Sequence, residues 1–313
     1  MAQQKGDMIM SEKETILVGV DGSPESLEAA EWAGARAEQS GGKLQVLCAY
    51  ALPSYTAASM DSGFAVVDND AIRDSAQTVV DQAVSHLEKR GYQAEGRVEA
   101  GDPTAILVQL SKQVDLIVVG TRGGGGFTDR LLGATSSALP AYSRCPVVVV
   151  PRRGADDQFV PVKKIVIGVD GSTRSRKSLR RAITETQVWG AELTAVEAVP
   201  MASSAGVLAW LPASVDRESI LRDVRSELKE ICKEETADSG VKIHSHALDG
   251  NAAALLNEFS TAVDLMVVGT RGRGGFAGAL MGSTSQSLLA HAACPVLVVP
   301  TGDRDLAPKN SGR

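Results

Sequence analysis

A segment that occurs twice limits how this chain of 313 residues can fold. Residues 16–23 read ILVGVDGS, and residues 165–172 read IVIGVDGS. Residues 114–151 agree with residues 263–300 at 24 of 38 positions. A constant offset of 149 positions relates four pairs of landmarks, which are Asp21 and Asp170, Gly120 and Gly269, Gly133 and Gly282, and Pro146 and Pro295. We therefore expect two similar domains, at residues 14–151 and 163–300, joined by a linker at residues 152–162.

Composition and charge narrow the class of protein. Hydrophobic residues make up 43% of the chain, yet no apolar run approaches the ~20 residues that span a bilayer. Residues 1–13 are polar and contain no apolar signal-peptide core, and we expect residues 1–13 and 301–313 to be disordered tails. A net charge of −6 argues against nucleic-acid binding, which usually needs a basic surface. These features predict a cytoplasmic protein that binds neither membrane nor nucleic acid.

Strands and helices alternate along each copy. In the first copy, strands are expected at residues 16–20, 44–50, 93–99, 116–119 and 147–150. Helices are expected at residues 24–39, at 68–90, from 103 onward and at 135–143, where Cys145-Pro146 breaks the last one. This order predicts the α/β class, with two copies of a five-stranded parallel sheet that carries helices on both faces, in a Rossmann-type arrangement. The last strands, 147–150 and 296–299, offer an edge through which the copies are expected to pair.

A glycine-rich loop follows the fourth strand of each copy, where open α/β sheets bind their ligands. In the first copy, nine residues separate Gly120-Thr-Arg-Gly123 from Gly133, which opens the next helix; the second copy repeats this layout with Gly269, Gly272 and Gly282. Glycines let backbone N–H groups approach an anion, and a helix N-terminus supplies unpaired donors. The pattern favours a phosphate-binding loop, and flexible turns without a ligand are the alternative. Neither the P-loop motif nor GxGxxG after the first strand is present.

The Val-Asp-Gly-Ser start, the G-x2-G-x9-G-[ST] loop and the closing Cys-Pro-Val strand resemble the universal stress proteins in their tandem-domain form. The resemblance covers about residues 15–151 and 164–300. It implies an adenine nucleotide alpha hydrolase-like fold that binds ATP, with or without Mg²⁺. It places Asp21 and Asp170 beside the adenosine, Ala49 and Ala198 at the adenine, and the pairs Val119-Gly120 and Val268-Gly269 at the ribose. The remaining residues, Ala134 included, would lie at the phosphates. The nucleotide contacts so implied are Asp21, Ala49, Val119, Gly120, Arg122, Gly123, Gly133, Ala134, Thr135 and Ser136 in the first copy, and Asp170, Ala198, Val268, Gly269, Arg271, Gly272, Gly282, Ser283, Thr284 and Ser285 in the second.

One departure from the family pattern predicts that the two sites are not equivalent. The pattern has Ser or Thr after the third glycine, but the first copy has Ala134 where the second has Ser283. Losing a hydroxyl bonded to a charged phosphate costs about 1.5–3 kcal/mol, or roughly one to two decades in affinity. Thr135, Ser136 and the backbone amides remain in the first copy. We therefore expect the second site to bind ATP more tightly.

Two functions fit these observations. The leading one is an ATP-binding protein of stress response or signalling whose nucleotide occupancy alters its interactions, as a homodimer or with an unidentified protein partner. The alternative is a slow ATPase or nucleotide hydrolase on the same fold. A scaffold with structural ATP sites is a third interpretation. No His, Lys or carboxylate pair lies at a readable position near the loops to activate water, and the two aspartates at most help to bind Mg²⁺.

Several conspicuous residues are given structural roles. His244 and His246 alternate on one strand and lack a third metal ligand, so we expect solvated positions. Ser23 and Ser172 have no partnered base and are interpreted as helix N-caps. The four cysteines form no CxxC pair and no zinc spacing, so reduced core thiols are expected at Cys48, Cys145, Cys232 and Cys294.

Two further features leave alternatives open. Basic residues crowd the start of the first helix of the second copy, where they oppose the helix dipole. They form either a solvated face or a surface for acidic groups of a second protomer, and are Arg174, Arg176, Lys177, Arg180 and Arg181. The loops at residues 53–68 and 202–216 form either a lid or partner surface, or fold onto their own domain, and carry Tyr55, Phe64, Val207, Leu208, Trp210 and Leu211.

Overall fold

One continuous sheet crosses the whole molecule. The computed structural model describes residues 13–51, 69–123, 132–152, 154, 158–200, 217–273 and 280–300. Its ten strands follow the order β3-β2-β1-β4-β5-β10-β9-β6-β7-β8. Their bounds are β1 Thr15–Gly19, β2 Lys43–Tyr50, β3 Glu95–Ala100, β4 Leu116–Gly120, β5 Val147–Val150, β6 Lys164–Val169, β7 Glu192–Val199, β8 Ile243–Asp249, β9 Leu265–Gly269 and β10 Val296–Val299.

Each half of this sheet is parallel, and the two halves meet in one antiparallel pair, β5 with β10. In that pair Val148 lies opposite Leu297, and these residues occupy equivalent positions of the two copies. The register therefore places a pseudo-twofold axis between Val148 and Leu297. The predicted α/β class and the predicted edge pairing of the copies are both confirmed, and the two five-stranded sheets become one.

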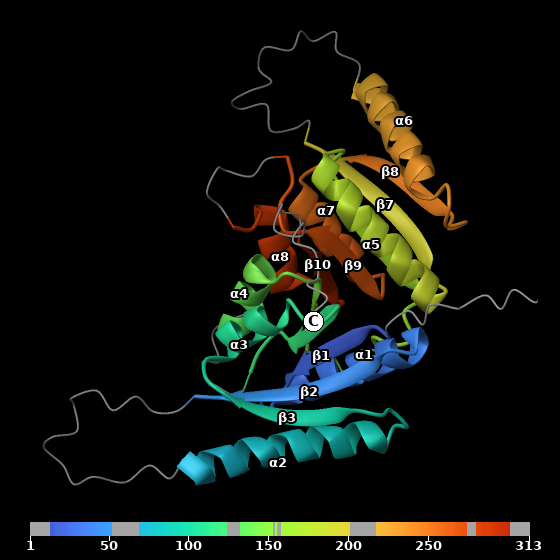
Figure 1. The fold of residues 1–313 in the computed structure, drawn as a ribbon. Helices are drawn as coiled ribbons and strands as arrows, with labels where there is room; N and C mark the ends of the chain where they lie inside the picture. The colour runs from blue at the N-terminus through green and yellow to red at the C-terminus, as the bar shows by residue number, and fades with distance from the viewer. Residues whose placement is uncertain are drawn as a thin grey trace, which may run out of the picture.

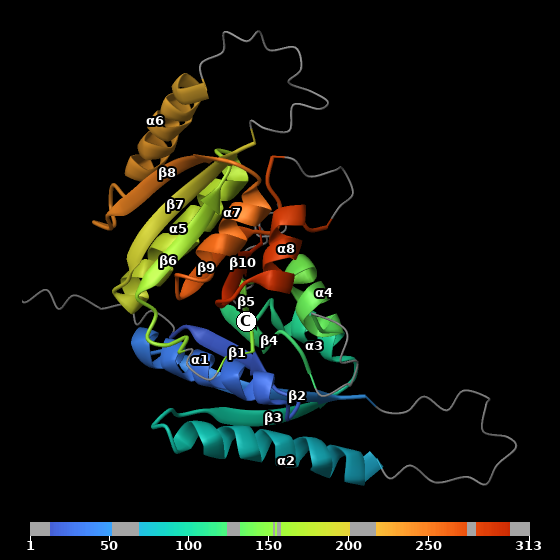
Figure 2. The same cartoon turned by 180° about the vertical axis from the view of Figure 1, so that it is seen from behind.

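Eight helices of the described residues cover the sheet in two layers (Figures 1 and 2). The helices α1, α2, α5 and α6 pack on one face, and α3, α4, α7 and α8 on the other. Each layer encloses an apolar cluster that runs without a break through both copies. The helices are α1 Pro24–Ser40, α2 Asn69–Glu88, α3 Pro103–Leu110, α4 Ala134–Tyr142, α5 Thr173–Trp189, α6 Arg217–Glu235, α7 Ala252–Phe259 and α8 Ser283–His291.

The helix boundaries follow local capping chemistry. Ser23 and Ser172 are the N-caps of α1 and α5, where each side chain accepts a backbone N–H bond in the first turn, so their interpretation as caps is confirmed. The predicted end of the fourth helix is wrong by a short distance. Helix α4 contains Pro140 and ends at Tyr142, one residue before the predicted end. The Cys145-Pro146 pair lies beyond this point and does not end the helix.

The linker is less independent of the domains than its polar sequence suggests. Phe159 and Val162 are buried, with 9% and 1% of their surfaces exposed, and both belong to the apolar cluster that spans the two copies. The end of the linker therefore forms part of the core. The four cysteines are unpaired and buried, as predicted, and His244 and His246 are exposed.

Three of the five basic residues of α5 find acidic partners in their own chain, an arrangement that neither alternative describes, while Arg174 is exposed as a solvated face would have it. Arg176 bonds Glu234 and Arg180 bonds Glu235, both on α6. Arg181 pairs with Glu185 and with Glu14 of the first copy. These pairs offset the unfavourable interaction of the first-turn cations with the helix dipole.

Both candidate lid loops lie outside the described residues, as do residues 1–12 and 301–313. Within the described part of the chain, every helix is too short or too polar to cross a membrane.

Candidate functional site

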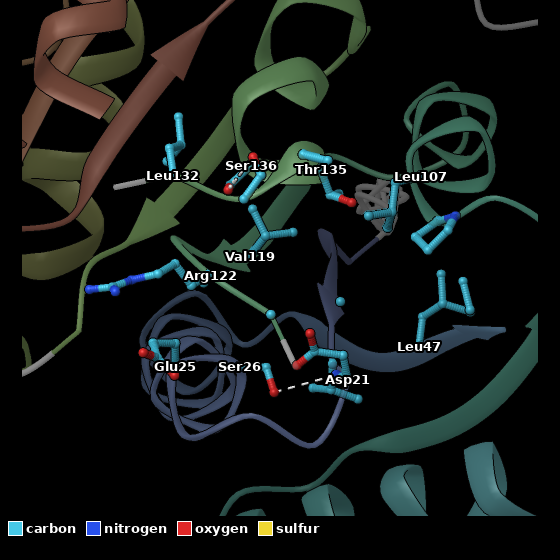
Figure 3. A pocket seen from close by; sticks show the side chains of 18 of the residues that line it. Asp21, Glu25, Ser26, Leu47, Leu107, Val119, Arg122, Leu132, Thr135 and Ser136 are labelled. Atoms are coloured by element: carbon cyan, nitrogen blue, oxygen red, sulfur yellow. Dashed lines mark hydrogen bonds between the residues drawn. The ribbon is translucent and has the colours of Figure 1, made fainter. Parts of the chain in front are cut away.

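A cavity of about 530 Å³ opens in the first copy at the carboxyl ends of β1 and β4. The strand order reverses between these two strands, which is where doubly wound sheets bind ligands. A volume of this size lies within the range of small-molecule sites. The cavity brings together all ten contacts that the sequence implies for the first copy, which are Asp21, Ala49, Val119, Gly120, Arg122, Gly123, Gly133, Ala134, Thr135 and Ser136 (Figure 3).

Asp21 is fixed by the turn that follows β1. Its Oδ1 accepts hydrogen bonds from the amide and the hydroxyl of Ser23, at 3.0 and 2.6 Å. Its Oδ2 faces the glycine loop, because a Cβ on Gly123 would overlap that oxygen. The aspartate therefore lies directly against the loop as well as facing the cavity, and a side chain at position 123 would displace the carboxylate or the loop.

The second copy reproduces this arrangement. Asp170 accepts from the amide and hydroxyl of Ser172, at 3.0 and 2.6 Å, and a Cβ on Gly272 would overlap its Oδ2. The backbone amide of Arg273 also donates to Asp170 Oδ2. Burial alone would raise the pKa of Asp170, but the hydrogen bonds from Ser172 and Arg273 hold it below its usual value. The carboxylate is therefore ionised at neutral pH.

Helices α4 and α8 begin differently from the other helices whose caps are described. Ser23, Asp102, Ser172 and Asn251 cap α1, α3, α5 and α7 with their side chains. By contrast, the N-caps of α4 and α8 are Gly133 and Gly282, and neither helix has a side-chain cap. The first amides of these two helices are therefore left to another acceptor.

Nothing among the described residues requires glycine at the start of α8. Gly282 has φ −77° and ψ 154°, a conformation that any residue adopts. A Cβ there would approach Thr270 O no closer than 3.6 Å, an ordinary contact. Gly133 has φ −70° and is packed more tightly, with a Cβ position 3.2 Å from Ser136 Oγ. At Gly282 the missing side chain leaves the helix end open, and the described contacts would also admit a Cβ.

The hydroxyls around these helix ends have different tasks. Ser136 Oγ donates to Thr121 O at 2.7 Å, and Ser285 Oγ donates to Gly269 O at the same distance. These two hydroxyls brace the loop, a role that the sequence pattern does not indicate. Ala134 and Ser283 are exposed at the first helical position, and the Ser283 hydroxyl has no hydrogen bond to another described residue. The difference between Ala134 and Ser283 therefore lies at an exposed position and not among the hydroxyls that brace the loop.

Close packing also fixes Gly120, at the end of β4. A Cβ on Gly120 would lie 2.7 Å from the carbonyl oxygen of Glu25 in the first turn of α1. The absence of a Cβ at Gly120 thus lets the first turn of α1 pack directly against the end of β4. Val119 and Val268, which precede the paired glycines, are buried at 5% and 4% exposure. Ala49 and Ala198 lie near the ends of β2 and β7.

The arginines of the loops lie at the rim. In Figure 3 the Arg122 side chain runs outward, away from Asp21. Arg122 and Arg271 each have a buried Nε without a hydrogen-bond partner among the described residues. Such donors are available to an anionic ligand or to water.

Sequence reasoning missed several residues that line the cavity. Leu47 precedes Ala49 by two positions on β2 and so faces the same side, a signal that strand alternation carries. Pro103 and Leu107 come from the start of α3, which follows the turn at the same sheet edge. Arg152 comes from the linker, and no motif points to it.

A cluster of charges distinguishes the second copy. The Arg273 guanidinium lies against Gly171, 4.0 Å from Glu197 and 3.9 Å from Glu227. The equivalent positions in the first copy are Gly124, Cys48 and Thr78, none of them charged. Glu197 is 8% exposed, and burial raises its pKa to about 7, with Arg273 opposing the rise and Glu227 and Asp170 adding to it. Arg273 thus ties the second loop to the body of its domain.

No group of three or more His, Cys, Asp or Glu side chains among the described residues is placed to hold a metal ion. Near the first cavity the carboxyl groups are those of Asp21 and Glu25, and Glu25 lies 4.0 Å from Arg152. Asp21 is engaged by Ser23. The arrangement can bind an anionic ligand at two helix ends, and its described residues present no partnered pair of groups for acid–base chemistry.

Fold and site together define a tandem α/β protein with a ligand cavity at its sheet switch point. The Universal stress protein family matches the chain twice, at residues 13–151 and 161–300. The chain belongs to this family, in tandem form.

Similar proteins match nearly the whole chain. A universal stress protein of Mycolicibacterium smegmatis is 32% identical over 291 residues, covering 91% of this chain and 96% of that protein. One of Mycobacterium tuberculosis is 29% identical over 309 residues, covering 90% and 94%. The crystal structure of a universal stress protein from Archaeoglobus fulgidus has a TM-score of 0.66 at 21% identity, covering 93% of this chain and 100% of that one, and shows the same fold.

The contact between aspartate and loop glycine yields the first prediction. Gly123→Ala and Gly272→Ala should each lower the free energy of unfolding by about 1–3 kcal/mol, because the new methyl group displaces the aspartate or the loop. Combining Gly123→Ala with Asp21→Ala should cost less than the sum of the two, as measured by urea unfolding. Gly282→Ala is the matched control and should cost less than about 1 kcal/mol, because its Cβ has room and only the poorer N-cap residue opposes it. Strict additivity of the first pair would contradict the packing described.

The buried Glu197 makes stability depend on pH in a defined direction. Its pKa is raised to about 7 in the folded chain. The folded state therefore keeps a proton that the unfolded state has released, and stability falls as pH rises through this value. Between about pH 5.5 and about pH 8.5 the loss should be ~1–3 kcal/mol relative to Glu197→Gln, which cannot titrate. The stability of both proteins is measured by thermal unfolding at each pH. If stability changed with pH by the same amount in both, the pKa of Glu197 would not be raised.

Proposed function

We propose that each copy of this chain binds ATP, and that occupancy of the two sites alters what the protein interacts with in a stress response or signalling. The observation that carries the proposal is the uncapped glycine start of α4 and α8, since nothing among the described residues requires glycine at Gly282. An uncapped helix N-terminus at a ligand cavity suits a phosphate chain, because the amides and the helix dipole both favour an anion.

The residues present fit a nucleotide. The backbone amides at the start of α4 would hold phosphates, with Gly123 and Gly133 giving them room. The apolar part of the cavity, which includes Leu47, Leu107 and Val119, would enclose the adenosine beside Asp21. In the second copy the same roles would fall to α8, Gly272, Gly282, Val268 and Asp170. When bound, ATP supplies the negative charge that completes both helix ends.

Mg²⁺ would be held mainly by the phosphates. Asp21 Oδ1 and Asp170 Oδ1 already accept two hydrogen bonds each. Mg²⁺ commonly binds through one or two carboxylates together with substrate phosphates and water, so the aspartates would add at most a secondary contact. Four unpaired cysteines are consistent with a reducing compartment, and we place the activity in the cytoplasm.

The proposal predicts that the purified chain contains or takes up ATP, and that its two sites differ. The second site should be tighter because only Ser283 offers a hydroxyl at the first helical position. Gly282→Asp should therefore abolish the high-affinity step of an ATP titration, whereas Gly133→Asp should abolish the weaker step. Ala134→Ser should strengthen the first site, and Ser283→Ala weaken the second, each by roughly one to two decades. Equal effects at both sites would contradict the asymmetry.

Heating the purified chain and identifying released nucleotide by chromatography tests binding itself. Absence of both a bound nucleotide and a thermal shift on adding ATP would refute the proposal. ADP formation followed over hours distinguishes a sensor from a slow ATPase, with the combined Gly133→Asp and Gly282→Asp variant as the blank. ADP, AMP and cAMP as competitors define which part of the ligand is recognised.

A serine at the start of α8 should separate stability from binding. Gly282→Ser supplies the side-chain cap that Ser172 gives to α5, so the free energy of unfolding should stay equal or rise by about a few tenths of a kcal/mol. The added side chain blocks the approach to the helix amides, so ATP affinity at the second site should fall at least about tenfold. Calorimetry and thermal unfolding measure the two effects. A stable variant with unchanged affinity would show that the glycine does not serve the ligand.

A further inference from the structure

Four charged side chains form a closed ring where the two copies meet on the α1 and α5 side of the sheet. Arg36 of α1 bonds Glu185 of α5 with two nitrogens, at 2.7 and 3.1 Å. Arg36 also bonds Glu14 at 2.9 Å. Arg181 closes the ring, 2.6 Å from Glu185 and 3.5 Å from Glu14. Each copy therefore supplies one arginine and one glutamate.

The two central side chains of the ring are withdrawn from water, so the loss of either partner would be costly. The side chains of Arg36 and Glu185 are both fully buried. Burial alone would lower the pKa of Arg36, but Glu185 and Glu14 raise it; burial would raise the pKa of Glu185, but Arg181 and Arg36 lower it. Both groups are therefore charged. A buried pair of this kind adds little net stability, yet removing one partner is strongly unfavourable.

The two central residues occupy equivalent positions of the repeat. Arg36 and Glu185 are separated by the same 149 positions that relate Val148 to Leu297. The pseudo-twofold axis thus brings one position of the domain against itself, with opposite charges in the two copies. A neighbouring position has diverged as well, because the first copy has Trp32 where the second copy has Arg181. Trp32 packs on Trp189 of the second copy, with 5.7 Å between the ring centroids.

Pairing of like copies would lose this match. Two first copies would place Arg36 against Arg36, each keeping only Glu14 of its own copy. Two second copies would place Glu185 against Glu185 in the buried centre, each keeping only Arg181 of its own copy. The strand edges do not discriminate, because β5 and β10 are both short, apolar and almost identical. Charge at the axis is therefore the feature that tells unlike copies from like ones.

We propose that the ring formed by Glu14, Arg36, Arg181 and Glu185 is a pairing code, which makes the first-copy surface accept a second copy and reject another first copy. The partner that this surface fits is the other half of the chain. The tether of the linker favours that pairing through high local concentration, and the ring adds selectivity that the tether does not.

The first test removes the two central charges, keeps the volume and leaves Glu14 and Arg181 in place; because its centre carries no charge, this protein is called the charge-free chain. Arg36→Met combined with Glu185→Leu should fold with stability similar to wild type. Val148→Cys in the same chain reports like pairing, because two first copies would bring these cysteines face to face and give a disulfide-linked dimer of chains. After refolding in a redox buffer, the charge-free chain should form at least about tenfold more of this dimer than the chain with an intact ring. Equal amounts from both would overturn the proposal.

The second test reverses the code in full-length chains. Arg36→Glu with Val148→Cys on one chain, and Glu185→Arg with Leu297→Cys on another, each oppose pairing within their own chain. Refolded together, the new carboxylate of the first chain can face the new guanidinium of the second. A disulfide between the chains should therefore rise at least about tenfold over the same cysteines with native charges. Val148→Cys with Leu297→Cys in one native chain is the control for geometry.

No increase over the native-charge control would contradict a code, provided the reversed chains refold. Should they not refold, the charge-free chain decides alone. ATP binding is measured on the same samples. If the charge changes do not alter cross-linking but ATP still binds, only the pairing code is refuted. If they alter cross-linking as expected but ATP does not bind, only the proposed function is refuted.

Discussion

The pairing of two four-residue strands is the constraint on which the rest of the molecule depends. β5 reads VVVV and β10 reads VLVV, and all eight side chains are buried at 4% exposure or less. Exposed, each would be an apolar sheet edge open to aggregation. Joined to each other, they turn two small sheets into one and extend both apolar layers across the molecule. The linker residues Phe159 and Val162 and the ring at Arg36 take their places around that junction.

Much of the fold could be predicted from sequence because the determining signals are local or repeated. The offset between copies, the alternation of apolar strands with capped helices and the glycine spacing can all be read without knowledge of distant contacts. The site of the first copy could be predicted for the same reason. The ends of the strands and the starts of the helices converge at the switch point of the sheet, and this convergence does not depend on which side chains they carry. Even the small error at the end of α4 was local, because Pro140 lies inside a helix that ends at Tyr142.

What could not be predicted depends on contacts between distant residues. Nothing in the sequence shows that Arg181 meets Glu14, 167 positions away, rather than solvent or a second protomer. The approach of Arg273 to Glu197 and Glu227 likewise needs three separate elements to be in place. Arg152 lines the cavity only because the chain leaves β5 beside it. Bracing by Ser136 and Ser285 was missed because a hydroxyl at a helix start offers both a ligand contact and a carbonyl contact, and sequence does not choose between them.

The glycine at the start of α8 also records the history of the chain. The two copies descend from one domain, and the positions beside this glycine have drifted: Leu132 corresponds to Met281, and Ala134 to Ser283. Glycine persists at 133 and 282 although serine at 282 would suit both the backbone and the helix. Glycine at the same position in both copies therefore supports the proposed ligand role rather than a need of the fold.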